Sequence, residues 1–162
     1  MEVWDLYDKN GHKIDKTMIR GHKIPEGTYH LVVHIMIMNS KGDFLVQKRA
    51  KEKDLLPGIW AFTGGSATSG EDSHTAALRE LSEETGIDLQ AEDLFHKVRM
   101  LRGSSIADIW YGYLDVDVET LEFQKEEVSA LAFMSKDKVI EMINEGSFHK
   151  YDEKYLDEVF NI

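Results

Sequence analysis

Three glutamates near the middle of the chain have the spacing expected of a metal site. Glu80, Glu83 and Glu84 lie three and four positions apart, so on an α-helix their side chains would project from one face. Three like charges on one face repel one another, and helix stability does not require them. A divalent cation would remove the repulsion, and Mg²⁺ prefers carboxylate oxygens and is usually bound together with phosphates. The spacing therefore indicates chemistry on a phosphorylated compound.

The residues around these glutamates would hold such a site in place. Glu71 lies eight positions before Arg79, and a planar guanidinium can bind a carboxylate through two hydrogen bonds, which would pin a loop to the helix. Gly64 and Gly65 permit backbone conformations closed to other residues and close approach of a ligand. We expect the Gly64 carbonyl to bind metal and Gly65 to contact substrate. Gly86 is expected to end the helix.

The predicted reaction is attack of water on a phosphorus atom of a diphosphate. Bound Mg²⁺ or Mn²⁺ would bridge phosphate oxygens, offset developing charge and lower the pKa of a bound water, whose proton a carboxylate would take. We expect Glu83 and Glu84 to bind the metal, with Glu80 as either a third ligand or the base. The helix face does not distinguish these two roles. Arg79 belongs to the same predicted catalytic group.

Other residues are weaker candidates for the site. Arg49 ends a predicted strand that leads toward the motif and could hold a substrate phosphate; the alternative is a surface arginine. Trp60 and Tyr111 could stack on a nucleobase, although aromatic residues in strands usually fill the core. His30 and His34 share a face of one predicted strand and could bind metal. The alternative for both histidines is a core position satisfied by hydrogen bonds.

The elements that must position these residues form an α/β/α sandwich with a mixed β-sheet. The predicted strands cover residues 3–7, 29–38, 44–48, 59–62, 95–101, 108–117 and 130–134. One predicted helix begins at Asp72 or Ser73 and ends at Gly86, a second follows Ser135 to about Glu145, and a third covers 153–160. Residues 12–27 are expected to be loop. We expect one domain over 1–162, with an N-terminal hairpin or extension in 1–28.

Composition limits the class of partner. The chain has 162 residues, a net charge of −11 and no cysteine. Disulfides, thiolate metal sites and a cysteine nucleophile are therefore excluded. The negative charge argues against duplex nucleic acid and anionic membranes. The N-terminal residues lack the basic and apolar blocks of a signal peptide, and no apolar run approaches the ~20 residues needed to span a bilayer. We expect a cytoplasmic protein with a small phosphorylated substrate.

The motif over residues 65–87 resembles a known signature. Its pattern is Gly65-x5-Glu71-x7-Arg79-Glu80-Leu81-x-Glu83-Glu84-x-Gly86-Ile87. It resembles a complete Nudix box, and the preceding Pro57-Gly58-x-Trp60 is also typical of that family. The resemblance implies the Nudix α/β/α fold and Mg²⁺- or Mn²⁺-dependent cleavage of a nucleoside diphosphate linked to another moiety. It also implies metal on the box glutamates and on the carbonyl of the glycine before the box.

The same resemblance extends to residues outside the box. Many Nudix hydrolases recruit a loop glutamate after the central strands as a ligand or base, which implies that role for Glu126 or Glu127, with Glu127 slightly preferred; the alternative is a surface acidic pair. Many relatives dimerise, so a homodimer is one alternative to a monomer. The N-terminal half is similar to the isopentenyl-diphosphate-isomerase-like branch, in segments such as Trp4-Asp5-Leu6-Tyr7-Asp8 and Gln47-Lys48-Arg49.

Three functions remain in competition at this point. A pyrophosphohydrolase acting on a nucleoside di- or triphosphate, or a similar small diphosphate, is favoured. An isomerase of isopentenyl diphosphate is opposed by the lack of cysteine, because the true isomerases of that branch use a cysteine as their acid. A nucleotide-binding Nudix domain without catalysis is opposed by the complete set of box glutamates.

Overall fold

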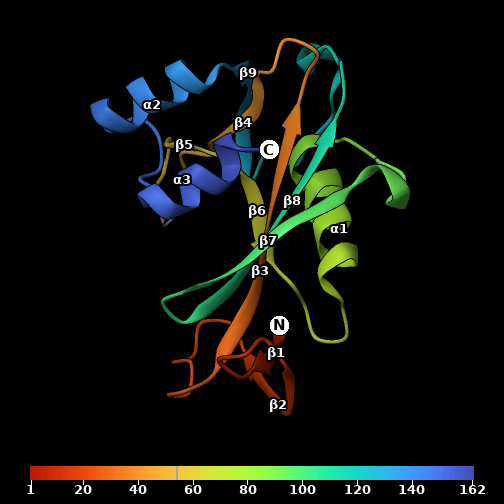
Figure 1. Cartoon of the computed structure of the whole chain (residues 1–162), viewed down its shortest axis with the longest axis vertical. Helices are drawn as coiled ribbons and strands as arrows, with labels where there is room; N and C mark the ends of the chain where they lie inside the picture. The colour runs from red at the N-terminus through yellow and green to blue at the C-terminus, as the bar shows by residue number, and fades with distance from the viewer. Residues whose placement is uncertain (54) are drawn as a thin grey trace.

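The computed structural model describes residues 1–53 and 55–162, and one long strand organises it. This strand, β3 (Tyr29–Met38), is bordered along its length by four others. It pairs antiparallel with β1 (Val3–Tyr7), β4 (Phe44–Arg49) and β6 (Thr63–Ser66), and parallel with β8 (Ser105–Tyr113). Figure 1 shows β3 running through the middle of the molecule. Its run of β-branched and aliphatic residues suits a strand that is buried on both faces.

The remaining strands extend the sheet on either side of β3. Within the described residues, nine strands form one mixed sheet. The other four are β2 (Lys13–Ile19), which pairs with β1, β5 (Trp60–Ala61) and β9 (Val128–Met134), which pair with β4, and β7 (Phe95–Arg102), which pairs with β8. Two short 3-10 helices, η1 (Ala91–Asp93) and η2 (Val118–Thr120), lie in the connections.

Helices cover both faces of the sheet, as the sequence predicts. Figure 1 shows α1 (Ser73–Thr85) on one side and both α2 (Lys136–Glu145) and α3 (Glu153–Phe160) on the other. Side chains on β3 alternate between two cores for this reason. Odd-numbered positions such as Ile35 pack in the core under α1, and even-numbered ones such as Met36 pack under α2 and α3. The predicted α/β/α sandwich is confirmed.

The helix that carries the glutamates has the predicted ends. The Asp72 side chain accepts a hydrogen bond from the Thr75 N–H at 2.7 Å and caps the start of α1. Gly86 ends it with a φ of 75°, in the left-handed region, and its N–H bonds to the Ser82 carbonyl. A Cβ on Gly86 would also overlap the main-chain carbonyl of Glu122. Only glycine fits this position.

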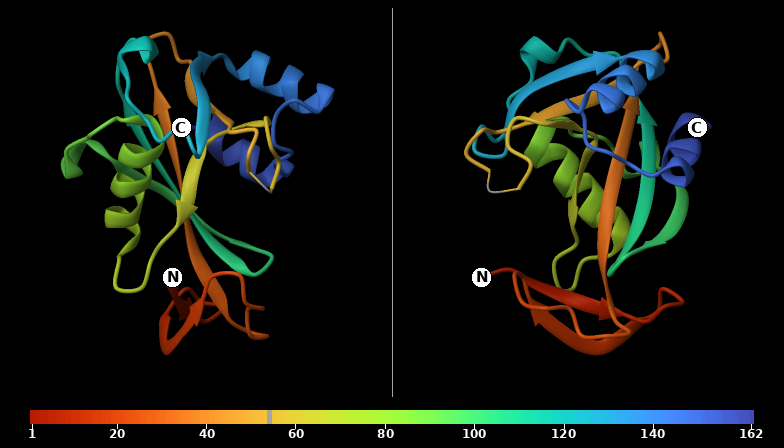
Figure 2. Two further views of the ribbon diagram at one scale, coloured as in Figure 1. Left: turned by 180° about the vertical axis from the view of Figure 1, so that it is seen from behind. Right: turned by 90° about the vertical axis from the view of Figure 1, so that its left-hand side faces the viewer.

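The N-terminal segment corrects one prediction. Residues 13–19 form β2 instead of loop, and β1 and β2 make an antiparallel hairpin at one end of the molecule (Figure 2). Met18 is buried and Ile14 is half-buried against a small core of Trp4 and Leu6. Four of the other five positions of β2 are polar and exposed, so the apolar alternation was too sparse to indicate a strand.

Smaller differences concern strand ends. The predicted strand at 59–62 is shortened to β5, a further strand, β6, follows it without having been predicted, and the strand predicted at 108–117 begins at Ser105 and ends at Tyr113. None of the helices in the described part of the chain is long and apolar enough to cross a membrane.

Candidate active site

A cleft of about 320 Å³ beside α1 brings most of the predicted site residues together. The cleft is formed by β6, α1, the end of β4, the segment before β9 and the N-terminal hairpin. The predicted residues that line it are Arg49, Gly64, Gly65, Arg79, Glu80, Glu83, Glu84 and Glu127. Positions spread over nearly eighty residues of sequence therefore meet in one place.

An ion pair fixes the loop that leads into α1. The Arg79 guanidinium donates to both oxygens of Glu71, at 2.6 and 2.9 Å, and to the Ser66 carbonyl at 3.1 Å. Glu71 also accepts from the Thr68 N–H at 2.8 Å. The hydrogen bond from Arg79 holds the pKa of Glu71 below its usual value. The predicted pairing of Glu71 with Arg79 is present, and it pins residues 66–72 to the helix.

The same arginine also binds two of the three box glutamates. Its Nη1 lies 3.0 Å from Glu80 Oε1 and 3.2 Å from Glu83 Oε2. Glu84 is buried and accepts a hydrogen bond from the Gly64 N–H at 3.3 Å. Burial, together with the charge of Glu80, raises the pKa of Glu84 to about 8. Burial likewise raises the pKa of Glu80.

A hard divalent cation fits the chemistry of this donor set. In residues 1–53 and 55–162, no group of three or more His, Asp or Glu side chains is arranged as a metal cluster, and Arg79 donates hydrogen bonds to Glu80 and Glu83. The candidate donors are nevertheless all oxygens, with like charges crowded in partly buried positions that a cation would stabilise. Gly65 makes room for one of them: a Cβ there would lie 2.5 Å from Glu80 Oε2.

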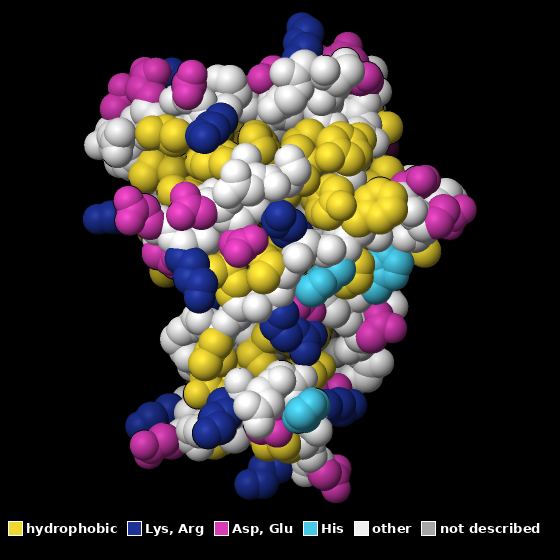
Figure 3. Space-filling view, in the orientation of Figure 1, with side chains coloured by type: hydrophobic (Ala, Val, Ile, Leu, Met, Phe, Trp, Pro, Cys, Tyr) yellow, Lys and Arg dark blue, Asp and Glu magenta, His cyan; other side chains and the backbone are white. Residues whose placement is uncertain are grey.

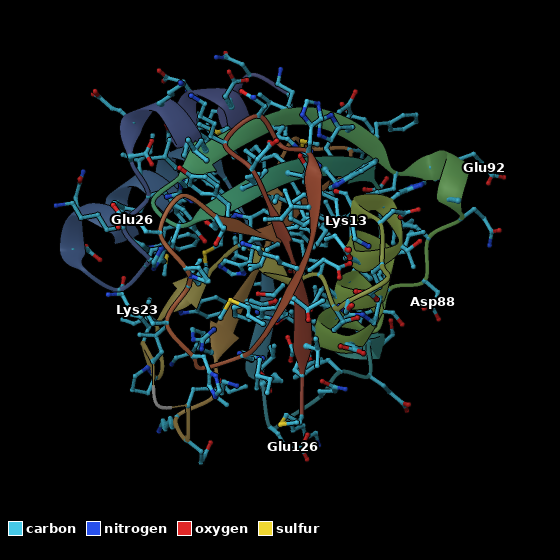
Figure 4. The ribbon with its side chains drawn as sticks, turned by 90° about the horizontal axis from the view of Figure 1, so that it is seen from below. Lys13, Lys23, Glu26, Asp88, Glu92 and Glu126 are labelled. Carbon is cyan, nitrogen blue, oxygen red and sulfur yellow. The ribbon has the colours of Figure 1, made fainter. Side chains whose placement is uncertain are left out.

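The segment before β9 forms the opposite lip of the cleft. Glu127 forms an ion pair with Lys53 at 2.5 Å, and the Gln124 N–H donates to the Glu83 carbonyl at 3.1 Å. Glu126, by contrast, is exposed and points away from the body of the molecule (Figure 4). The geometry therefore separates the acidic pair, with Glu127 in the cleft and Glu126 outside it.

A second hollow of about 300 Å³ adjoins the cleft across β6. The two share Arg49, Leu55 and residues 64–66. The second hollow has no acidic residue among the described residues that line it, and its walls include Phe62, His149 and Tyr151. Burial lowers the pKa of His149 and lowers that of His34, which also lines the hollow, to about 3. Within the described part of the chain, a hollow without acidic side chains, lined by apolar and aromatic residues and by Arg49 at the shared wall, thus lies next to a highly charged cleft.

Several predicted candidates lie elsewhere. The Trp60 side chain packs against the core under α2 and α3 and lines neither hollow. Tyr111 packs on Phe95, with ring centroids 5.5 Å apart. His30 stacks on Trp4 at 4.2 Å, whereas the ring of His34 bonds to the hydroxyl of Tyr155. The two histidines therefore face different surroundings and do not form one metal site with each other.

The cleft also contains residues that the sequence did not single out. They are Glu2, Lys53, Leu55, Ser66 and Gln124, and in the second hollow His149 and Tyr151. Arg20 lines the cleft as well, and the sequence pointed to it only as part of Arg20-Gly21, another segment similar to the isomerase-like branch. Lys53 follows Arg49 by four positions before Pro57-Gly58, a weak signal at best. For the others the sequence holds no local pattern, because they reach the site only through the fold.

The family described as the NUDIX domain matches residues 28–158 of this chain. The chain belongs to the Nudix family. An uncharacterized Nudix hydrolase of Listeria monocytogenes is 38% identical over 163 residues, which cover 100% of this chain and 95% of the relative. A solved protein of Deinococcus radiodurans shares the fold, with a TM-score of 0.80 over 99% of this chain and 98% of its own, at 22% identity.

Relatives of the isomerase branch are also found. An isopentenyl-diphosphate Δ-isomerase of Streptomyces coelicolor is 27% identical over 162 residues, covering 94% of this chain and 81% of that protein. The family resemblance read from the sequence is confirmed, and the chain is an enzyme of the Nudix hydrolase family. Enzymes of this family generally use divalent cations and act on small diphosphate compounds.

Proposed function

We propose that this Nudix hydrolase is a Mg²⁺- or Mn²⁺-dependent pyrophosphohydrolase that cleaves the pyrophosphate linkage of a nucleoside diphosphate derivative. The substrate would be a nucleoside di- or triphosphate or a similar small diphosphate. One observation carries the proposal: the box glutamates, Glu127 and the cations Arg49 and Lys53 line one cleft, and a less polar hollow with aromatic walls and no acidic side chain among its described residues adjoins it. The charged phosphates of the substrate would bind in the cleft, and its neutral ring would bind in the adjoining hollow.

The chain's own residues have distinct proposed tasks. Glu83, Glu84 and the Gly64 carbonyl would hold the cation, which when bound supplies charge stabilisation and an acidified water. Glu80 would be a third ligand or the base, and Glu127 an additional ligand or base. Arg79 would position the glutamates through its bond to Glu71.

The cations at the edge of the cleft would hold the phosphates. Arg49 lines both hollows, so its guanidinium lies where a phosphate would join the rest of the substrate. Its Nε donates to the Leu55 carbonyl at 2.9 Å, which leaves the terminal nitrogens for other acceptors. Lys53 would exchange its bond to Glu127 for a phosphate oxygen, and this exchange would free the glutamate.

The second hollow supports a nucleoside as the organic part. Its volume of about 300 Å³ matches the lower end of small-molecule sites. Neutral imidazoles both donate and accept hydrogen bonds, as the edge of a nucleobase requires. The edge-to-face pair of His149 and Tyr151, with centroids 4.5 Å apart, offers a ring face for stacking.

An isomerase is the second candidate, because an isopentenyl-diphosphate isomerase matches 94% of this chain. The chain has no cysteine to act as the acid. A test of this candidate is direct conversion of isopentenyl diphosphate to dimethylallyl diphosphate.

The experiment for the leading proposal is a panel of about fifty diphosphates with Mg²⁺ or Mn²⁺, scored for released phosphate or pyrophosphate. We expect Glu84→Gln to reduce kcat by roughly 10²–10⁴ while the fold survives, since it removes a ligand or base. Glu126→Gln, which changes an exposed neighbour of Glu127, is the matched control and should stay within about twofold of wild type. Equal activity in excess chelator would refute the metal mechanism. Tight nucleotide binding without turnover would favour a binding domain.

A further inference from the structure

The N-terminal hairpin contributes to the cleft although it lies outside the family match. The match begins at residue 28, whereas β1 and β2 span residues 3–19. Glu2, just before β1, and Arg20, just after β2, nevertheless line the same cleft as the box glutamates. Figure 2 shows the hairpin at the end of the molecule where the loop enters α1. This placement raises the question of what the hairpin adds to the site.

A buried carboxylate fastens the hairpin to that loop. Asp5 on β1 is only 6% exposed, and its two oxygens accept hydrogen bonds from the Ser69 hydroxyl at 2.7 Å and the Gly70 N–H at 2.9 Å. Lys13 on β2 forms an ion pair with it at 2.9 Å. The Ser69 N–H also donates to the Val3 carbonyl at 2.7 Å. Two side-chain bonds and one backbone bond therefore join the hairpin to residues 69–70.

The fastened loop is the one that carries the ion pair of the box. Residues 69–70 directly precede Glu71, whose carboxylate binds Arg79. A continuous series of contacts therefore runs from Asp5 through the loop to Arg79 and the acidic ridge of α1. The position of the hairpin relative to the cleft is set by these contacts.

Arg20 is the cation that the hairpin brings to the cleft. Its Nη1 donates to Glu2 Oε2 at 2.9 Å, and the other Glu2 oxygen accepts from the Trp4 indole N–H at 2.6 Å. The side chain of Arg20 is 61% exposed, and ion pairs at such exposure are weak. A phosphate, with more negative charge than one carboxylate, can therefore displace Glu2 as its partner.

The cations that line the cleft come from different elements of the chain. Residues 1–27 hold five Lys or Arg and five Asp or Glu, so the net charge of −11 belongs entirely to the rest of the chain, and side chains of both signs are visible at the hairpin end of the molecule (Figure 3). Arg49 and Lys53 lie on the lip formed after β4, and Arg20 lies on the hairpin, so cations reach the cleft from two separate elements. An anion held between these two elements would be contacted by cations from both.

We propose that Arg20 binds a phosphate of the substrate, that Glu2 is the partner it leaves when it does so, and that Asp5 is a positioning residue that places Arg20 by fastening the hairpin to the box loop. The identity of the anion rests on the proposed function. The competing explanation is a surface ion pair between Arg20 and Glu2 with no part in binding.

The test measures binding of methylenediphosphonate, a non-hydrolysable diphosphate analogue, by calorimetry in the presence of Mn²⁺. Arg20→Gln should raise Kd about tenfold, because it removes one charge-assisted contact to phosphate. Glu2→Gln should lower Kd by about two- to fivefold, because it removes a competing carboxylate. Lys23→Gln, an exposed lysine of the same segment that points away from the cleft in Figure 4, is the matched control and should change nothing.

The opposite signs separate the two explanations. A structural surface pair predicts no change in Kd for Arg20→Gln or Glu2→Gln. An Arg20→Gln variant that binds the analogue as well as Lys23→Gln does would overturn the inference, and so would weaker binding by Glu2→Gln.

The role of Asp5 has its own readout. Asp5→Asn, or the milder Ser69→Ala if the first variant does not fold, should raise Kd only while Arg20 is present. The double variant with Arg20→Gln should then bind no more weakly than Arg20→Gln alone. Additive effects would show that Asp5 acts on stability and not through Arg20.

Turnover of a nucleotide with an unchanged Kd in Arg20→Gln would reject this inference and leave the proposed function intact. Weaker binding of the analogue by Arg20→Gln, without turnover of any compound in the panel by the wild-type protein, would support this inference and reject the proposed function.

Discussion

Replacement of Gly65 by alanine should impair turnover far more than stability. The added Cβ would lie 2.5 Å from Glu80 Oε2, whereas carbon and oxygen atoms in contact normally stay beyond about 3.2 Å. The Glu80 carboxylate must therefore move by roughly 1 Å. A displacement of this size in a catalytic group lowers the rate by about 10²-fold, which corresponds to roughly 2.7 kcal/mol in the activation free energy. Because the clashing atoms are the end of a flexible side chain, the fold should lose only about 1 kcal/mol.

The assay is kcat and the Mn²⁺ activation constant on the best substrate of the panel, with Tm measured alongside. For a domain of this size, about 1 kcal/mol lowers Tm by ~2–4 °C. A second variant tests the cause: Glu80→Asp shortens the clashing side chain, so it should reduce activity in wild type but cost less in the Gly65→Ala background. Coupling of roughly 0.5–3 kcal/mol between the two sites is expected. Full activity and unchanged metal dependence in Gly65→Ala would refute the assignment of Glu80 to the catalytic centre.

Three further predictions concern stability. Asp108 is 1% exposed and binds Arg99 through two hydrogen bonds of 2.8 and 2.7 Å, so Asp108→Asn should lower the unfolding free energy by about 3 kcal/mol in urea titrations. Burial lowers the pKa of His34 to about 3, so between pH 6.5 and 5 the unfolded chain binds a proton that the folded chain does not. The contribution of His34 to stability should therefore fall by up to about 2 kcal/mol over that range, and His34→Gln should remove this contribution from the measured pH dependence. Gly86→Ala should destabilise by about 2–3 kcal/mol in thermal melts, because it adds overlap with a main-chain carbonyl to the strain of positive φ, whereas Gly146→Ala, at φ 85° with no atom within 4 Å of its Cβ, should cost only about 1 kcal/mol.

The predictable parts of the structure are those that depend on residues close to one another in the sequence. Helix α1 has a capping aspartate, a left-handed glycine and an apolar face within fifteen residues, so its start at Asp72 or Ser73 and its end at Gly86 were predicted without knowledge of the fold. The buried strand β3 was equally predictable, because a run of apolar β-branched residues favours a buried strand over other secondary structure. Strand β2 was not predictable from its sequence, since only Ile14 and Met18 of its seven residues face a core.

The residues of the candidate site likewise fall into those that local sequence predicts and those that only the fold brings together. The box predicts the acidic ridge because Glu80, Glu83 and Glu84 are neighbours on one helix. Arg20 and His149, in contrast, are brought to the two hollows by strand pairing and by the return of the chain after α2. His149, for example, is placed by its N–H bond to the Trp60 carbonyl at 2.7 Å, a contact across nearly ninety residues. The roles of the individual residues remain predictions for the variants above.

The parallel pairing of β3 with β8 also matters while the chain is being made. β3 is synthesised about seventy residues before its parallel neighbour, and the crossover includes all of α1. At a translation rate of roughly 5–20 residues per second, one edge of this apolar strand would wait for several seconds without its partner. Nascent chains should therefore be most open to chaperone capture and to misassembly in that interval, after β6 has emerged and before β8 closes the gap.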